Sequence, residues 1–187
     1  MPNFIDAKFG RMGNRLFQLA FIYAQFRDEK IPDIYLQDYT LFDKYKSEIQ
    51  ELFKQEGEPL DYISIHVRKG KNPSVPNEPS YSENPFYVNL TATGYYQDAM
   101  EQFPNDKFLI FSDDMDWCKR NFIGDFKFHE GNELEDFSAM SRCKGHIIAN
   151  SSFSWWAAYL GGGKTVAPQK WFSNGNKINY PSDWIVL

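Results

Sequence analysis

The segment HVRKGK carries cationic side chains suited to a phosphate group. Arg68 stands two residues after His66 and directly before Lys69. A guanidinium can donate two parallel hydrogen bonds to phosphate oxygens, so Arg68 is the natural partner for such a group. His66 is explained equally well as a satisfied core histidine, and Lys69 and Lys71 as solvated loop charges. The segment therefore indicates a possible anion site, with a structural alternative for each residue except Arg68.

The segment IIANSSFSWW places small polar side chains between an apolar strand pattern and a helix pattern. The first backbone N–H groups of a helix have no partner inside the helix, and the helix dipole favours negative charge there. The turn that leaves the strand is Asn150, Ser151 and Ser152, and its small hydroxyl residues at a helix start are typical of an anion site. The alternative is an ordinary N-cap, for which Ser is favoured, followed by a helix whose two tryptophans pack in the core.

A third stretch, KFLIFSDD, ends an apolar strand pattern in the carboxylates Asp113 and Asp114. A carboxylate can accept hydrogen bonds from the N1–H and amine of guanine or from ribose hydroxyls, but Asp is also a common helix cap. The three stretches together resemble a nucleoside diphosphate site. The chain has no GxxxxGK[ST] loop, and GRMGN lacks the third glycine of the dinucleotide fingerprint, so neither P-loop nor nicotinamide chemistry is expected.

Alternating strand and helix patterns after residue 60 predict how these stretches meet. The expected strands are 62–67, 107–111, 126–128, 146–150 and, as the last, 164–168. The expected helices are 91–102, 113–122, 133–142 and 153–160. Such alternation with short connections predicts an α/β fold with a parallel sheet covered by helices on both faces. Ligands of such sheets bind beyond the carboxyl ends of the strands, where the polar stretches lie.

The first 60 residues and the loop after HVRKGK have weaker patterns. We expect a short strand at 4–8, an amphipathic helix at 14–28, a weak strand or loop at 31–37 and a helix at 42–55. Gly57 and Pro59 end the last of these elements. A long polar, proline-rich loop is expected over 70–85.

Composition limits the class of protein. Hydrophobic residues make up 42% of the 187 residues and charged residues 24%, which is typical of a folded globular chain. The net charge of -5 argues against a nucleic-acid partner. Cys118 and Cys143 have no metal-like spacing, which favours reduced thiols and a cytoplasmic location. No signal peptide or membrane-span pattern is apparent, so we expect no integral membrane segment.

Several motifs, in the same order along the chain, resemble those of one protein family. GRMGNRLFQLAFIYA resembles the opening G-x-G-N-Q-L-F-Q-x-A of the family 11 glycosyltransferases, the alpha-1,2-fucosyltransferases. HVRKG is similar to their H-x-R-R-G-D motif, LTATGYYQDAM to their tyrosine-pair helix, and FSDDMDWCK to their F-S-D-D-x-x-W-C-K segment. MSRCKGHIIANSSFSWWAAYLG resembles their longest signature, and VAPQKWF their closing strand. The resemblance covers Gly10 to Phe172.

This resemblance implies a type B glycosyltransferase fold. Its Rossmann-like donor-binding domain would span 60–187, and a reduced acceptor-side lobe would span 1–59. The family transfers fucose from GDP-fucose to a galactose-containing glycan, with inversion and without a metal or other cofactor. By resemblance Arg68 and His66 are the catalytic candidates. The implied donor-binding residues are Asn14, Lys69, Asp113, Asp114, Asn150, Ser151, Ser152 and Phe153.

The sequence departs from the family pattern at three motif positions and in length. Lys69 replaces the second Arg of H-x-R-R-G-D, Lys71 replaces its Asp, and Arg15 replaces the Gln of G-N-Q-L-F-Q. A protonated lysine is a poor general base, so Lys71 removes a carboxylate near the expected reaction centre. The region between the opening motif and HVRKG is also far shorter than the resemblance implies for the family. Conceivable replacement bases are Asp6, Asp38, Glu78 and Glu83.

These departures leave three hypotheses open. The first is an active transferase using GDP-fucose or another GDP-sugar. The second is a binding module that holds GDP, a nucleotide sugar or a glycan without turnover. The third is a homo-oligomer in which a neighbouring copy completes the cleft. We favour catalytic transfer because, beyond Lys69 and Lys71, the donor-binding signature is intact.

Overall fold

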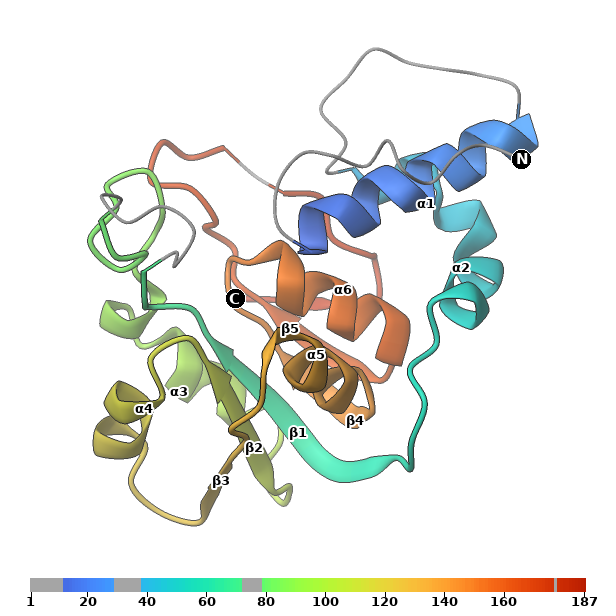
Figure 1. The fold of residues 1–187 in the computed structure, drawn as a ribbon. Helices are drawn as coiled ribbons and strands as arrows, with labels where there is room; N and C mark the ends of the chain where they lie inside the picture. The colour runs from blue at the N-terminus through green and yellow to red at the C-terminus, as the bar shows by residue number, and fades with distance from the viewer. Residues whose placement is uncertain (1–11, 29–37, 72–78, 177) are drawn as a thin grey trace.

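The computed structural model describes residues 12–28, 38–71, 79–176 and 178–187, which fold around a six-stranded sheet (Figure 1). The strands are β1 Leu60–Val67, β2 Phe108–Ser112, β3 Phe126–Phe128, β4 Cys143–Ile147, β5 Lys164–Ala167 and β6 Ile185–Val186. They pair in the order β3-β2-β1-β4-β5-β6, and every pairing is parallel. The chain runs outward from β1 to β3 and then returns to β4, so the connection reverses between β1 and β4. This is the switch point at which Rossmann-like sheets bind ligands.

Helices cover both faces of this sheet, as the sequence predicts (Figure 1). The helices are α1 Met12–Asp28, α2 Lys46–Leu52, α3 Tyr95–Met100, α4 Met115–Asn121, α5 Glu133–Ser141 and α6 Ser152–Gly161. Helices α3 and α4 lie on one face, and α5 and α6 on the other. Helices α1 and α2 pack on the outside of α6. No helix in the described part of the chain is long and apolar enough to cross a membrane.

Two cores result from the alternation of side chains along the strands. Ile63 and Ile65 of β1 pack with the residues of α3 and α4 on one face. Leu109 and Phe111 of β2 belong to the core on the other face, beneath α5 and α6. Between the central strands, the Ser64 hydroxyl lies 2.8 Å from His146 Nδ1. Burial lowers the pKa of His146 to about 4, so this contact between β1 and β4 holds a neutral imidazole at physiological pH.

The two tryptophans of α6 are core residues. Trp155 and Trp156 are 1% and 0% exposed. The Phe17 ring of α1 lies 4.7 Å from Trp155 and 5.1 Å from Trp156, between ring centroids. Phe42 stacks on Trp156 at 5.5 Å. This aromatic packing holds Phe17 of α1 and Phe42 against α6 and confirms the packing interpretation of the tryptophans. The division into domains at residue 60 stays a prediction.

Four sequence-based predictions of elements differ from the structure. The strand predicted over 146–150 is β4 Cys143–Ile147, which begins and ends three residues earlier because Cys143 already pairs with Leu60 of β1. The helix predicted over 91–102 is divided into a 3-10 turn (Leu90–Ala92) and α3, because Gly94 adopts φ 74°, outside the helical region. The helix predicted over 42–55 begins with a 3-10 turn at Asp43–Tyr45 before α2, and another turn, Tyr39–Leu41, precedes it. Strand 164–168 is not the last strand, since β6 follows it; two residues are too few to show a periodic pattern. The elements predicted at 4–8 and 31–37 lie outside the described residues.

Candidate functional site

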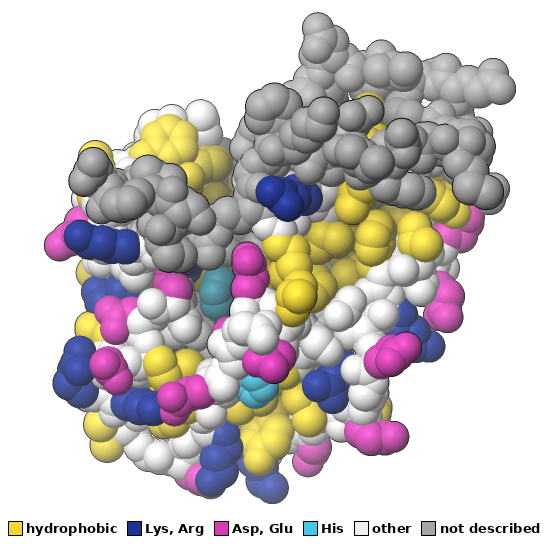
Figure 2. Space-filling view, viewed as in Figure 1, with side chains coloured by type: hydrophobic (Ala, Val, Ile, Leu, Met, Phe, Trp, Pro, Cys, Tyr) yellow, Lys and Arg dark blue, Asp and Glu magenta, His cyan; other side chains and the backbone are white. Residues whose placement is uncertain are grey.

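A pocket of about 590 Å³ lies at the carboxyl ends of the central strands, a size that suits a small ligand or cofactor. Figure 2 shows a hollow on this side of the molecule in which a histidine lies beside acidic side chains. Most of the residues singled out from the sequence line this one pocket. They are Asn14, His66, Arg68, Asp113, Asn150, Ser151, Ser152 and Phe153. Residues from four separate segments therefore converge, as the strand-end rule predicts.

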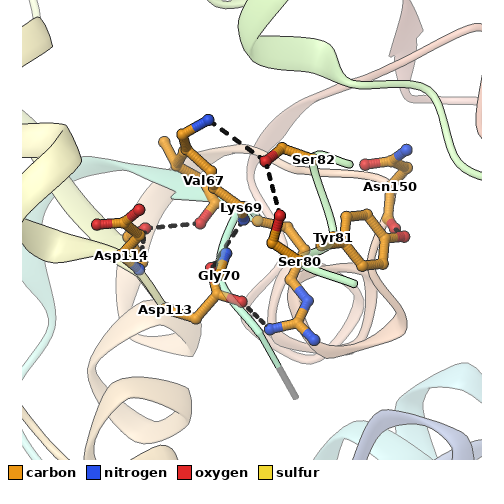
Figure 3. A network of polar contacts seen from close by, with 11 residues as sticks. Val67, Lys69, Gly70, Ser80, Tyr81, Ser82, Asp113, Asp114 and Asn150 are labelled. Carbon is orange, nitrogen blue, oxygen red and sulfur yellow. Dashed lines mark hydrogen bonds and ion pairs between the residues drawn. The ribbon is translucent and has the colours of Figure 1, made fainter. Parts of the chain in front are cut away.

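Asp113 organises the loop that follows β1. Its carboxylate pairs with the Arg68 guanidinium, and its Oδ1 accepts hydrogen bonds from the backbone N–H groups of Lys69 (2.8 Å) and Gly70 (2.9 Å) (Figure 3). A Cβ on Gly70 would lie 2.5 Å from the Asp113 carbonyl oxygen, so this close approach requires glycine. The Arg68 guanidinium also lies 5.0 Å from the centroid of the Tyr81 ring. These contacts hold the arginine in the wall of the pocket.

The pocket-lining residues do not include two of the predicted ligands, Lys69 and Asp114. Asp114 caps α4, because its Oδ1 accepts a hydrogen bond from the backbone N–H of Trp117 at 3.0 Å. Lys69 Nζ lies 4.8 Å from the centroid of the Trp117 ring and 3.4 Å from Ser82 Oγ. Asp114 is therefore a helix cap, which is the alternative that the sequence left open for it. Of the two adjacent carboxylates, Asp113 is the one that lines the pocket.

The start of α6 presents backbone donors to the pocket. Ser151 is the N-cap residue, but its side chain makes no capping hydrogen bond. Ser154 Oγ instead donates to the Ser151 carbonyl and accepts from the Ala149 N–H, both at 3.2 Å, and so stabilises the turn from inside. The first turn contains no acidic residue that would offset the positive end of the helix dipole. Ser151, Ser152 and Phe153 therefore lie at a helix terminus suited to an anion.

A second helix begins at the same place. Gly13, in the first turn of α1, is so close to α6 that a Cβ on it would lie 2.5 Å from the Ser152 carbonyl carbon and 2.7 Å from the Phe153 nitrogen. Asn14 follows it in the pocket wall. The first turn of α1 likewise has no acidic residue. Two positive helix ends therefore meet in the wall of the pocket that Arg68 also lines, and both favour a negatively charged ligand. Sequence reasoning named Asn14 but missed Gly13, although it quoted the GRMGN segment that contains it.

Asn150 has a supporting function in this structure. Its side-chain Nδ2 donates to the backbone carbonyl oxygens of Val88 (2.9 Å) and Trp171 (3.0 Å). The backbone carbonyl of Asn150 accepts a hydrogen bond from the Tyr81 hydroxyl. The residue is 1% exposed. Asn150 thus joins the end of β4 to two distant loops, and its amide nitrogen is used for that purpose.

We expect Asn150→Ala to lower the free energy of unfolding by about 2 kcal/mol, because it removes two hydrogen bonds of a buried amide. The Val88 carbonyl loses this donor, whereas the Trp171 carbonyl keeps the Val88 N–H at 3.3 Å. Urea denaturation measures the loss. Asn121→Ala is the control, since that side chain is exposed and bonds only within its own helix; it should change stability by less than about 0.5 kcal/mol. Equal effects of the two substitutions would contradict the supporting function of Asn150.

The pocket also contains acidic residues that sequence reasoning missed. Glu133 and Asp136 line it from the start of α5. Burial raises the pKa of the Asp136 carboxyl, and the hydrogen bond to His129 Nδ1, at 2.7 Å, works in the opposite direction. Of the four conceivable replacement bases, Asp6 and Glu78 lie outside the described residues. The other two, Asp38 and Glu83, are not among the residues that line the pocket.

The sheet order and the pocket define the class of protein. This is a Rossmann-like α/β protein with an arginine and two helix starts at the carboxyl ends of its central strands. The family model described as glycosyl transferase family 11 matches residues 10–187. The chain therefore belongs to glycosyltransferase family 11, as the sequence motifs predict.

Curated relatives support the same family. The chain is 35% identical to an alpha-1,2-colitosyltransferase of Escherichia coli, over 80% of this chain and 59% of the relative. It is 29% identical to the O-antigen biosynthesis glycosyltransferase WbnK of Escherichia coli, over 82% of this chain and 59% of that protein. It is 32% identical to the galactoside 2-alpha-L-fucosyltransferase SEC1 of Bos taurus, over 70% of this chain and 38% of that protein. The matches thus span less than two thirds of each of these relatives. No solved structure matches the chain.

Proposed function

We propose that this chain binds GDP-fucose, or another GDP-sugar, and transfers the sugar with inversion to a galactose hydroxyl of a glycan. The observation that carries the proposal is the convergence of Arg68, the start of α6 and the start of α1 on one pocket. The relatives named for fucose and colitose transfer support the reaction class and leave more than one donor sugar open.

The pocket offers charge stabilisation for such a transfer. An acceptor oxygen would attack the anomeric carbon of the sugar while the bond from that carbon to the diphosphate breaks, so the bonding electron pair passes to the departing GDP. Arg68 and the backbone N–H groups of Ser152 and Phe153 would compensate the resulting negative charge, as the proposed metal-independent reaction requires. The acceptor hydroxyl gives up its proton to a general base as the new bond forms.

Binding without turnover is the second candidate function. It is favoured by Lys71 at the place of the motif carboxylate and by the positions of Asp38 and Glu83 away from the lining of the pocket. In a related form of this candidate, a second copy of the chain supplies the missing part of the acceptor site. Dependence of activity on protein concentration would reveal that form.

We expect slow hydrolysis of GDP-fucose, or transfer to a galactoside, when the chain is incubated with the donor and a panel of galactosides. Mass spectrometry of the donor and the glycans measures both outcomes. Arg68→Ala, which removes the proposed phosphate contact, should give neither product. Untouched donor after long incubation with the wild-type chain would contradict the transferase proposal and favour the binding module.

A further inference from the structure

A cluster of aromatic rings forms one wall of the pocket, and part of it faces solvent. The Phe86 side chain is 50% exposed. Its ring centroid lies 5.0 Å from that of Phe172 and 5.1 Å from that of Tyr87. Tyr87 in turn stacks on Tyr81 at 4.2 Å. All four residues line the pocket that contains Arg68. A large apolar side chain exposed in the wall of a polar pocket suggests that a ligand covers it.

The backbone holds this cluster in place. Tyr87 and Phe172 form an antiparallel bridge, and the Ser173 N–H donates to the Phe86 carbonyl at 3.0 Å. The Asn150 side chain ties both segments to the end of β4, as described above. The rings are therefore held before any ligand arrives, which lowers the entropic cost of binding.

The two sides of the pocket differ in chemistry. Asp113 follows β2, and Glu133 and Asp136 follow β3, so the carboxylates lie on the β3 side of the sheet. Phe172 follows β5, so the aromatic cluster lies on the opposite side of the central strands. Arg68 follows β1, between them. Carboxylates suit the N–H and O–H donors of a nucleoside. Aromatic faces suit a ligand with a face of C–H groups, because the ring face carries partial negative charge.

We propose that Phe86 and Phe172 form the acceptor subsite, which binds the apolar face of a pyranose ring of the glycan. This inference rests on the proposed function. A galactopyranose presents the C–H groups of C3, C4 and C5 on one face and hydroxyls at its edge. Asn84 also lines the pocket, and its Oδ1 accepts a hydrogen bond from the Phe86 N–H at 3.0 Å. Its Nδ2 can donate to such a hydroxyl. The subsite would place the acceptor beside the sugar of a donor whose diphosphate lies at Arg68.

The test titrates lactose and N-acetyllactosamine into the GDP-bound chain and measures their contact and affinity by saturation-transfer NMR. We expect Phe86→Ala to weaken glycan binding about tenfold and Phe86→Tyr to retain it, because only alanine removes the aromatic face. The GDP-induced rise in melting temperature should be unchanged in both variants. Ile123→Ala is the control: this side chain is 79% exposed and does not line the pocket, and its loss should leave glycan affinity unaltered.

Each failure has a distinct meaning. A wild-type chain that binds GDP but neither glycan would overturn the subsite and leave the donor site standing. A Phe86→Ala variant that loses GDP as strongly as glycan would also overturn it, since the rings would then be stacking the base. A wild-type chain that shows no response to GDP would overturn the proposed function on which the inference rests.

Discussion

Arg68→Ala is expected to remove almost all of the rise in melting temperature that GDP gives to the wild-type chain. A ligand that binds only the folded state at about 100 times its dissociation constant stabilises that state by about 2.7 kcal/mol. For a chain of this size the shift is about 5–10 °C. The guanidinium of Arg68 can form paired, charge-assisted hydrogen bonds to the diphosphate. Its loss should weaken binding about 100-fold, which reduces the shift at the same GDP concentration to about 1 °C.

Differential scanning fluorimetry across a GDP series measures this effect. Arg68→Lys should give an intermediate shift, because lysine keeps the charge and loses the planar fork. The ligand-free melting temperature of each variant must be recorded too, since Asp113 loses its guanidinium partner. Arg120→Ala, on the exposed side of α4, is the matched control and should retain the full shift. A wild-type profile that stays flat up to millimolar GDP would refute the donor site itself.

Gly13→Ala is expected to weaken GDP binding by more than about tenfold and to lower the free energy of unfolding by about 2 kcal/mol. The added Cβ would meet the Ser152 carbonyl carbon at 2.5 Å and the Phe153 nitrogen at 2.7 Å. These are backbone atoms that cannot rotate away, so the start of α1 must move from the start of α6. The displacement would separate the two helix ends that face the proposed diphosphate.

Isothermal titration with GDP and urea denaturation measure the two effects of this substitution. Arg15→Ala is the control, because Arg15 is exposed on the same helix and is not among the pocket-lining residues. It should alter neither quantity strongly. If Gly13→Ala binds GDP like the wild type, the close contact between α1 and α6 has no part in binding the nucleotide.

Much of the sheet could be predicted because its signals are local. The strand 62–67 and the helix at 153–160 show their hydrophobic periods within a few residues. The alternation of strands and helices along the chain then implies parallel pairing of the strands. The same reasoning failed where the local signal was weak or interrupted. Ile185–Val186 is too short to show a period, and Gly94 interrupts an otherwise helical pattern.

The candidate site, too, could be predicted only in part from the sequence. Motif residues such as Arg68 and Ser152 could be named from the chain alone, because a strand end and a helix start are local features that place their donors predictably. Asp113 and Asp114 are adjacent and identical in type, and no local rule tells which carboxylate turns into the pocket and which caps α4. That choice depends on where the loop after β1 comes to lie.

Amino-acid order alone was enough to indicate the family, the parallel sheet and most of the singled-out residues that line one pocket, because these follow from motifs and from periods of a few residues. The use of each side chain depended on contacts between segments far apart in the chain. The Asn150 amide bonds carbonyls 62 and 21 residues away. The Phe86 ring meets that of Phe172 because Tyr87 and Phe172 form a bridge that neither local sequence predicts. Such partners are set by how the packed elements bring loops together, which no short-range pattern encodes.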